Sequence, residues 1–178
     1  MKKMYLFFII GGIFVFGLAG IAGKLLLAKV SDDHSVHHHA GFQIYLDGEK
    51  QNFTSIRYMS IVPCGDNDHD LTPEEKQLAK AHLHEGVEDV VHVHAAGATW
   101  GDLLKNLKFN WDQSKEISAY DPDNKIEDIL NRPIEADQSI IIVIGDQASA
   151  SAYLQDKVTI EKIKEVEQQS ELCGDTKK

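Results

Sequence analysis

The sequence predicts an α+β domain in which a mixed β-sheet has a helix packed across it, in a β-grasp-like arrangement, preceded by one N-terminal transmembrane helix. Two segments that alternate apolar and polar residues, 42–53 and 82–94, predict hairpins. A helical stripe in residues 99–107 and a continuous apolar run in 139–145 supply the packed helix and a central strand. The content of 43% hydrophobic and 26% charged residues is typical of a globular chain.

The N-terminal 30 residues differ from the rest of the chain. An uncharged apolar run occupies residues 4–23, and at about 1.5 Å per residue it covers roughly 30 Å, the thickness of a bilayer core. Lys2 and Lys3 precede the run, as in a signal anchor, and cleavage at the GIAG segment is the alternative. The pattern indicates a single-pass protein of the cell membrane whose C-terminal domain lies outside the cytoplasm. The expected parts are an anchor (1–30), a juxtamembrane linker (31–40), a His-rich α+β domain (41–147) and a C-terminal helix and tail (148–178).

Net charge and cysteine content restrict the partners and the chemistry. The net charge of −10 argues against a nucleic-acid partner, because phosphate binding needs a basic surface. The two cysteines, Cys64 and Cys173, form no C-x-x-C pair, so a thioredoxin-like redox motif is absent. In an oxidising compartment they would form one disulfide, worth about 4–5 kcal/mol in the chain-entropy model. Two free thiols are the alternative.

The first hairpin and the two helix starts are predicted from local signals. In residues 42–53 the apolar side chains alternate, and Asp47-Gly48 supplies a tight turn. Thr72 and Glu75 form a capping box at the start of a short polar helix, which we expect on the surface. Thr99 and Asp102 are placed in the same way at the start of the second helix. The buried stripe of that helix is Leu103, Leu104 and Leu107.

The second half of the chain supplies the remaining elements. Residues 116–120 are a plausible strand, and residues 126–134 form a turn-rich connection. The run in residues 139–145 is apolar at successive positions, which predicts a central strand buried on both faces. Residues 148–172 repeat apolar side chains at helical spacing.

Histidines occur as three His-x-His pairs. Residues i and i+2 of a strand point to the same face, so with Val91 and Val93 facing the core, His92 and His94 share the opposite face. The same rule places His82 and His84 on one face. An odd number of loop residues opposes His82 to His92 and joins the four side chains in one patch, whereas an even number separates the pairs. The first pair, His37 and His39, also avoids the apolar face of its strand and would border the patch if the strands are neighbours.

Clustered imidazoles suit a divalent transition metal, Zn²⁺ or Cu²⁺. The expected ligands are His37, His39, His82, His84, His92 and His94. Glu85 and Glu88 are close enough in sequence to add a ligand or to orient a ring. We expect the ion to be lost below about pH 6, because only neutral imidazole is a ligand. The alternatives are a pH-sensitive surface patch and histidines without a specific role. His34 and His69 are expected in solvated loops, and His38, on the other face, is expected to be structural.

Several segments resemble an uncharacterised group of membrane-anchored prokaryotic proteins with His-rich extracytoplasmic domains. The segments are HHHAGFQIYLDGEKQNF, HLHEGVEDVVHVHAAGATWGDLL and EADQSIIIVIGD, in that order, over roughly residues 37–146. The resemblance implies the same fold and the same six histidine positions. Some members carry a protein-disulfide isomerase label, which this chain does not support because it lacks C-x-x-C. Ala136 stands where the group usually has glycine.

These observations favour a membrane-anchored metal-binding domain for capture, buffering or delivery over an enzyme. No nucleophile elbow, phosphate loop or H-E-x-x-H motif is present. One alternative is a metal-dependent hydrolytic or redox enzyme with Glu85 or Glu88 as its base. The other is an envelope interaction module in which the histidines are incidental.

Overall fold

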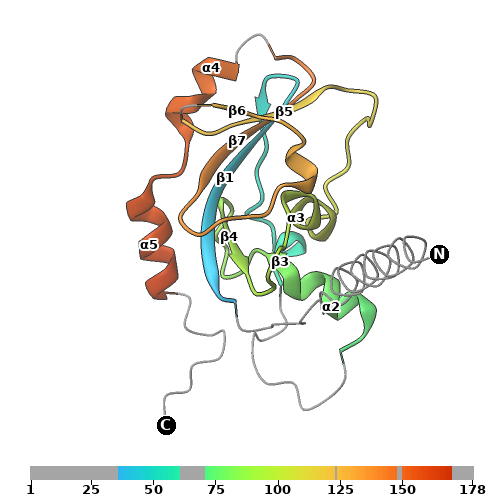
Figure 1. Cartoon of the computed structure of the whole chain (residues 1–178), viewed down its shortest axis with the longest axis vertical. Coiled ribbons are helices and arrows are strands. Elements are labelled where there is room, and N and C mark those ends of the chain that lie inside the picture. The colour runs from blue at the N-terminus through green and yellow to red at the C-terminus, as the bar shows by residue number, and fades with distance from the viewer. Residues whose placement is uncertain (1–35, 61–70, 123, 148–149, 170–178) are drawn as a thin grey trace, which may run out of the picture. The chain divides into compact units, whose positions relative to one another are not determined.

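The structure is a computed structural model that describes residues 36–60, 71–122, 124–147 and 150–169. Its strands form one mixed sheet in the order β3-β4-β1-β7-β5-β6, with β2 paired to β1 (Figure 1). The predicted α+β class with a mixed sheet is confirmed. The strands are β1 (His38–Leu46), β2 (Glu49–Lys50), β3 (Ala81–His82), β4 (Val90–Val93), β5 (Ile117–Tyr120), β6 (Lys125–Ile126) and β7 (Ser139–Ile144). The α-helices are α2 (Pro73–Lys80), α3 (Trp100–Asn106), α4 (Ala150–Tyr153) and α5 (Ile160–Gln169), and the 3₁₀ turns are η1 (Ile56–Tyr58), η2 (Ile129–Asn131) and η3 (Leu154–Asp156).

The centre of the sheet is the parallel pair of β1 and β7, in the register Phe42↔Ile140. Alternate residues of β7 enter clusters on opposite faces of the sheet, so the predicted central strand is confirmed. Ile140, Ile142 and Ile144 belong to the main core, and Ile141 and Val143 belong to the second cluster.

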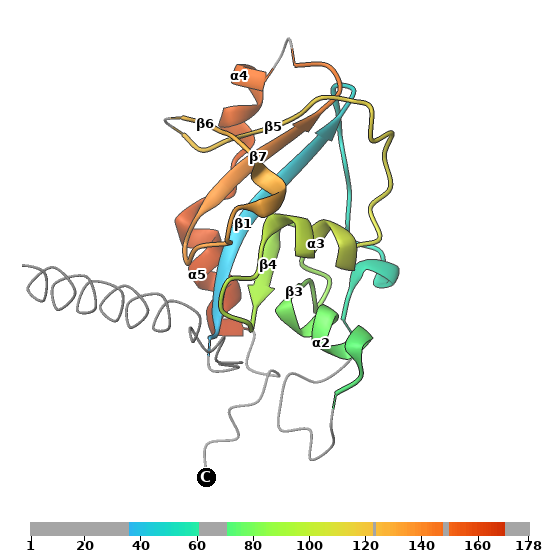
Figure 2. The same ribbon diagram turned by 45° about the vertical axis from the view of Figure 1, so that its right-hand side comes forward.

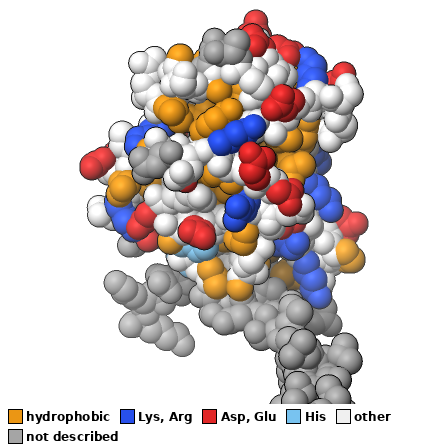
Figure 3. Space-filling view, turned by 45° about the horizontal axis from the view of Figure 1, so that its top comes forward, with side chains coloured by type: hydrophobic (Ala, Val, Ile, Leu, Met, Phe, Trp, Pro, Cys, Tyr) orange, Lys and Arg blue, Asp and Glu red, His pale blue; other side chains and the backbone are white. Residues whose placement is uncertain are grey.

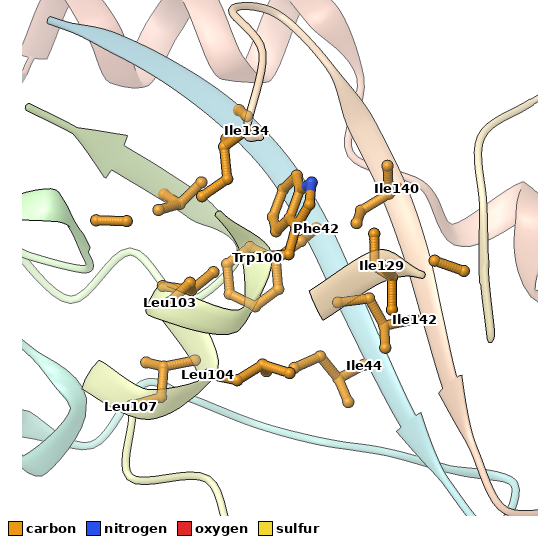
Figure 4. Close-up of a cluster of buried hydrophobic side chains, with 14 of the residues drawn as sticks. Phe42, Ile44, Trp100, Leu103, Leu104, Leu107, Ile129, Ile134, Ile140 and Ile142 are labelled. Atoms are coloured by element: carbon orange, nitrogen blue, oxygen red, sulfur yellow. The ribbon is translucent and has the colours of Figure 1, made fainter. Parts of the chain in front are cut away.

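The main core lies between the sheet and α3. Trp100 and Leu103 of α3 are fully buried and pack with Phe42 of β1 (Figure 4). The predicted stripe is confirmed, because Leu104 and Leu107 are only 2% exposed. Both predicted capping boxes also form: Thr72 with Glu75 at the start of α2, and Thr99 with Asp102 at the start of α3. The side chains of the main core therefore fix the position of β1 relative to α3. Strand β1 carries two of the histidines.

Strand β1 starts earlier than the sequence pattern indicated. Its first residue is His38, inside the segment assigned to a linker, because residues 38–41 pair with β4. The predicted hairpin turn at Asp47-Gly48 is present, and both residues have positive φ, as a type I′ turn requires. The early start of β1 places its histidines within the sheet.

Helix α5 covers the other face of the sheet, opposite to α3 (Figures 1 and 2). Val158, just before α5, comes so close to β1 that a Cβ added at Gly41 would lie 2.6 Å from its Cβ. The Lys162 ammonium lies 2.6 Å from the carboxylate of Asp89, which joins α5 to the loop before β4. Within the described residues 150–169, the predicted helical spacing corresponds to separate short helices, and Thr159 caps α5 by accepting from the Lys162 amide.

The described helices are too short for a membrane span. None of them combines the length and the apolar character needed to cross a bilayer. Helix α5 has 10 residues, which at about 1.5 Å each reach half of a bilayer core. We therefore correct two predictions, the transmembrane helix before the α+β domain and the location of that domain outside the cytoplasm as a single-pass membrane protein. The segment behind both predictions, residues 1–30, lies outside the described residues.

The other predictions in the undescribed segments remain untested. The disulfide between Cys64 and Cys173 involves two residues outside the described ranges. His34 and His69, expected in loops, also lie outside them.

Candidate metal centre

Three neighbouring strands bring the six paired histidines to one face of the sheet. His39 of β1 is opposite His92 of β4, and His92 is opposite His82 of β3. The register between β3 and β4 is the one expected from an odd loop, so the predicted shared face is confirmed. His39, His92 and His82 thus form a row across the three strands. His37 and His94 lie on the same face beyond one side of this row, and His84 lies on the same face beyond its other side. We call these six residues the His cluster.

Each of the six imidazoles contacts at least two others. The His92 ring is central, and its centroid lies 4.2 Å from that of His39 and 4.4 Å from that of His94. His37 and His84 each place their ring centroid 4.4 Å from that of His92, on different sides of the ring. His82 lies at the edge of the cluster, 5.7 Å from His92 between centroids.

Most of the His cluster is buried, unlike the pH-sensitive surface patch that was one alternative to a metal site. His39 is 2% exposed, His82 is 4% and His92 is 1%. The alternation of side chains along a strand identified the face that avoids the main core. It could not reveal that the segment containing α5 packs on that same face. In the view of Figure 3 only a small area of histidine reaches the surface, beside an acidic side chain. His37 is the exposed member of the cluster.

The cluster contains two groups of three histidines that could hold a metal ion. In each group the candidate ligand nitrogens lie within 4.8 Å of one another. The first group is His37, His92 and His94, and the second is His39, His84 and His92. His82 is outside both groups, and its Nδ1 lies 3.0 Å from the carbonyl oxygen of Leu78. That hydrogen bond needs the proton on Nδ1, which leaves Nε2 as the basic nitrogen of the ring.

Three ring nitrogens of the cluster are buried without a protein partner in the described structure. They are Nδ1 and Nε2 of His39 and Nε2 of His94. A buried polar atom left unpaired costs about 1–3 kcal/mol. Such nitrogens suit a metal ion, which accepts their lone pairs. By contrast, His38 on the opposite face bonds through Nε2 to the carbonyl of Ile134 at 3.0 Å, in agreement with its expected structural role.

The two candidate carboxylates have different surroundings. Glu85 lies 3.7 Å from Nδ1 of His84, the nitrogen turned away from His92, and is therefore placed to orient that ring. Glu88 is bonded instead to Asn52 and to the amide of Phe53. Glu167 of α5 was not among the predicted residues, and its negative charge opposes the lowering of the His39 pKa that burial causes. Only the packing of α5 brings this residue near the cluster, and no local sequence signal indicated it.

Burial favours the neutral form of five cluster histidines, His39, His82, His84, His92 and His94. It lowers the pKa of His39 and His82 to about 4 and that of His94 to about 3, because the charged form loses its hydration. The pKa of His84 is lowered by the same cause, and that of His92 is lowered by burial and by the neighbouring imidazoles. The neutral ligand form therefore persists to a lower pH than the ordinary pKa of 6.5 allows, and the loss of metal expected near pH 6 moves to more acidic conditions.

Hydrogen bonds between α2 and α3 hold the edge strand of the cluster. Asn106 of α3 donates to the carbonyl of Ala81 at 2.7 Å, directly before His82. Lys80, the last residue of α2, pairs with Asp102 of α3 at 2.9 Å. The polar helix α2, expected as a surface element, therefore also positions the strand that presents His82 and His84.

Replacing His39 by leucine is expected to stabilise the metal-free protein by about 1–2 kcal/mol. The change keeps the side chain near its volume and removes two buried nitrogens that have no described partner. Urea unfolding in the presence of a chelator measures the effect. The matched control is His38→Leu, which deletes the hydrogen bond to Ile134 and is expected to destabilise. A loss of stability in His39→Leu equal to that of the control would contradict the argument.

Comparisons with known proteins add no relative. No family model, no curated protein and no solved structure matches the chain. The resemblance to the group of His-rich prokaryotic proteins stays a prediction, and so does the β-grasp-like arrangement. What the structure establishes is that this α+β chain carries histidine clusters that could hold a metal ion.

Proposed function

We propose that this protein binds a divalent transition metal ion, Zn²⁺ or Cu²⁺, through the His cluster and acts in metal capture, buffering or delivery. The observation that carries the proposal is the convergence of histidines from β1, β3 and β4 into groups whose ligand nitrogens lie within 4.8 Å. An all-imidazole ligand set suits these two ions.

Burial and electrostatics support this proposal over incidental histidines. A solvated surface would expose its imidazoles, whereas His39, His82 and His92 are at most 4% exposed. Lowered pKa values hold His39 and His94 in the neutral form that a metal needs. Burying polar imidazoles costs folding free energy, and such a cost is expected where a bound metal ion offsets it.

Metal retention by the full-length protein tests the proposal. The protein is freed of metal with a chelator, dialysed against micromolar Zn²⁺ or Cu²⁺, and its metal content per chain is measured by elemental analysis. We expect at least one ion per chain, and an affinity at least about tenfold lower for His92→Gln. The control is His38→Gln, whose side chain faces the other side of the sheet and can still donate to Ile134. Folded wild-type protein that retains neither metal would overturn the proposal.

A further inference from the structure

His92 is the only residue shared by the two groups of the His cluster. The first group adds His37 and His94, and the second adds His39 and His84. Strand pairing explains this position, because β4 runs between β1 and β3 and presents His92 to both. The two groups therefore lie on either side of one imidazole ring.

The two nitrogens of His92 face different groups. Its Nε2 contacts Nε2 of His37, a member of the first group. Its Nδ1 contacts Nε2 of His84, a member of the second group. The lone pairs of Nδ1 and Nε2 diverge in the plane of an imidazole ring, so one ion cannot be bound by both nitrogens. A single ion would use one group and leave the other without its metal.

We propose that the His cluster holds two divalent metal ions bridged by the ring of His92. One ion is bound by His37, His94 and Nε2 of His92. The other is bound by His39, His84 and Nδ1 of His92. Three protein ligands leave each ion a coordination position for water or for a small ligand. This inference rests on the proposed function and adds to it the number of ions and their connection.

The protons and charges of the bridge balance. Neutral His92 carries one N–H proton, and the second ion to bind replaces that proton, which leaves to the buffer. The bridging ring is then an imidazolate with one negative charge. Two carboxylates lie near the second group and offset part of the remaining positive charge, Glu85 beside His84 and Glu167 near His39.

Titration of the full-length protein with Cu²⁺ alone tests the bridge. We expect two copper ions per chain by elemental analysis and an EPR intensity well below two spins, because copper ions joined by an imidazolate couple antiferromagnetically. One copper per chain would overturn the bridge and leave the proposed function in place. Two coppers with full intensity would also overturn it. Folded protein without bound copper would overturn both proposals.

Single substitutions in each group assign the two ions. His37→Gln removes a ligand of the first group only, and because His37 is exposed the variant should keep the wild-type fold. His84→Gln removes a ligand of the second group only. Each variant should fall from two coppers to one and regain the full EPR intensity of one spin. His38→Gln is the control and should keep two coupled ions. Two coupled ions in either group variant would overturn the assignment.

Discussion

The metal-free protein is expected to lose stability steadily as the pH falls from about 7 to about 4. In this range the unfolded chain protonates its histidines near the ordinary pKa of 6.5. The folded chain keeps His39 and His82 neutral down to about 4 and His94 down to about 3. Because the unfolded state binds more protons, the free energy of unfolding falls with falling pH, by up to about 1.4 kcal/mol per pH unit for each such histidine. The stability is fully present above pH 6.5 and is lost toward the folded pKa values.

Urea unfolding with a chelator at pH 7.5, 6.5, 5.5 and 4.5 measures this dependence. Glu85 and Glu167 oppose the effect, because their negative charges raise the pKa values of His84 and His39. In the variant His39→Leu the free energy of unfolding should change less steeply with pH, by the equivalent of roughly one proton. His38→Gln should keep the pH dependence of the wild type. A midpoint that stays constant from pH 7.5 to 5.5 would show that the cluster is not held neutral by burial.

Replacing Phe42 by alanine is expected to reduce the free energy of unfolding by about 3–5 kcal/mol. Phe42 is 1% exposed and packs its ring 5.9 Å from that of Phe53 and 6.2 Å from that of Trp100, between centroids. The substitution removes a large side chain from the layer between β1 and α3 and leaves a cavity there. Such a loss is a large share of the 5–15 kcal/mol that is typical of a native protein.

Urea unfolding at neutral pH measures the change, with Ile56→Ala as the control. Ile56 is an apolar side chain that is 73% exposed, so its truncation should change stability by less than about 0.5 kcal/mol. Equal effects of the two substitutions would show that the layer around Phe42 does not form the core. Metal binding by the folded fraction of Phe42→Ala should persist, because Phe42 lies on the opposite face of β1 from His39.

Local rules predicted much of the fold. The two capping boxes at Thr72 and Thr99 form as expected, because each depends on residues only three positions apart. The apolar run of β7 is buried on both faces because no polar residue interrupts it. The membrane anchor was inferred from the length of an uncharged apolar run and from the two lysines before it, and no described helix supports it.

The sequence by itself determined that each His-x-His pair points away from the main core, because side chains alternate along any strand. Only the tertiary structure decided that β1 pairs with β4, which brings His39 against His92. It also decided that the segment containing α5 packs on the same face of β1 and β4 as the histidines, against Gly41 and Val90, and that His39, His82 and His92 are buried. The physical reason is that alternation is a property of adjacent residues, whereas strand pairing and layer packing join residues that are distant in the chain, such as His39 with His92 and Asp89 with Lys162.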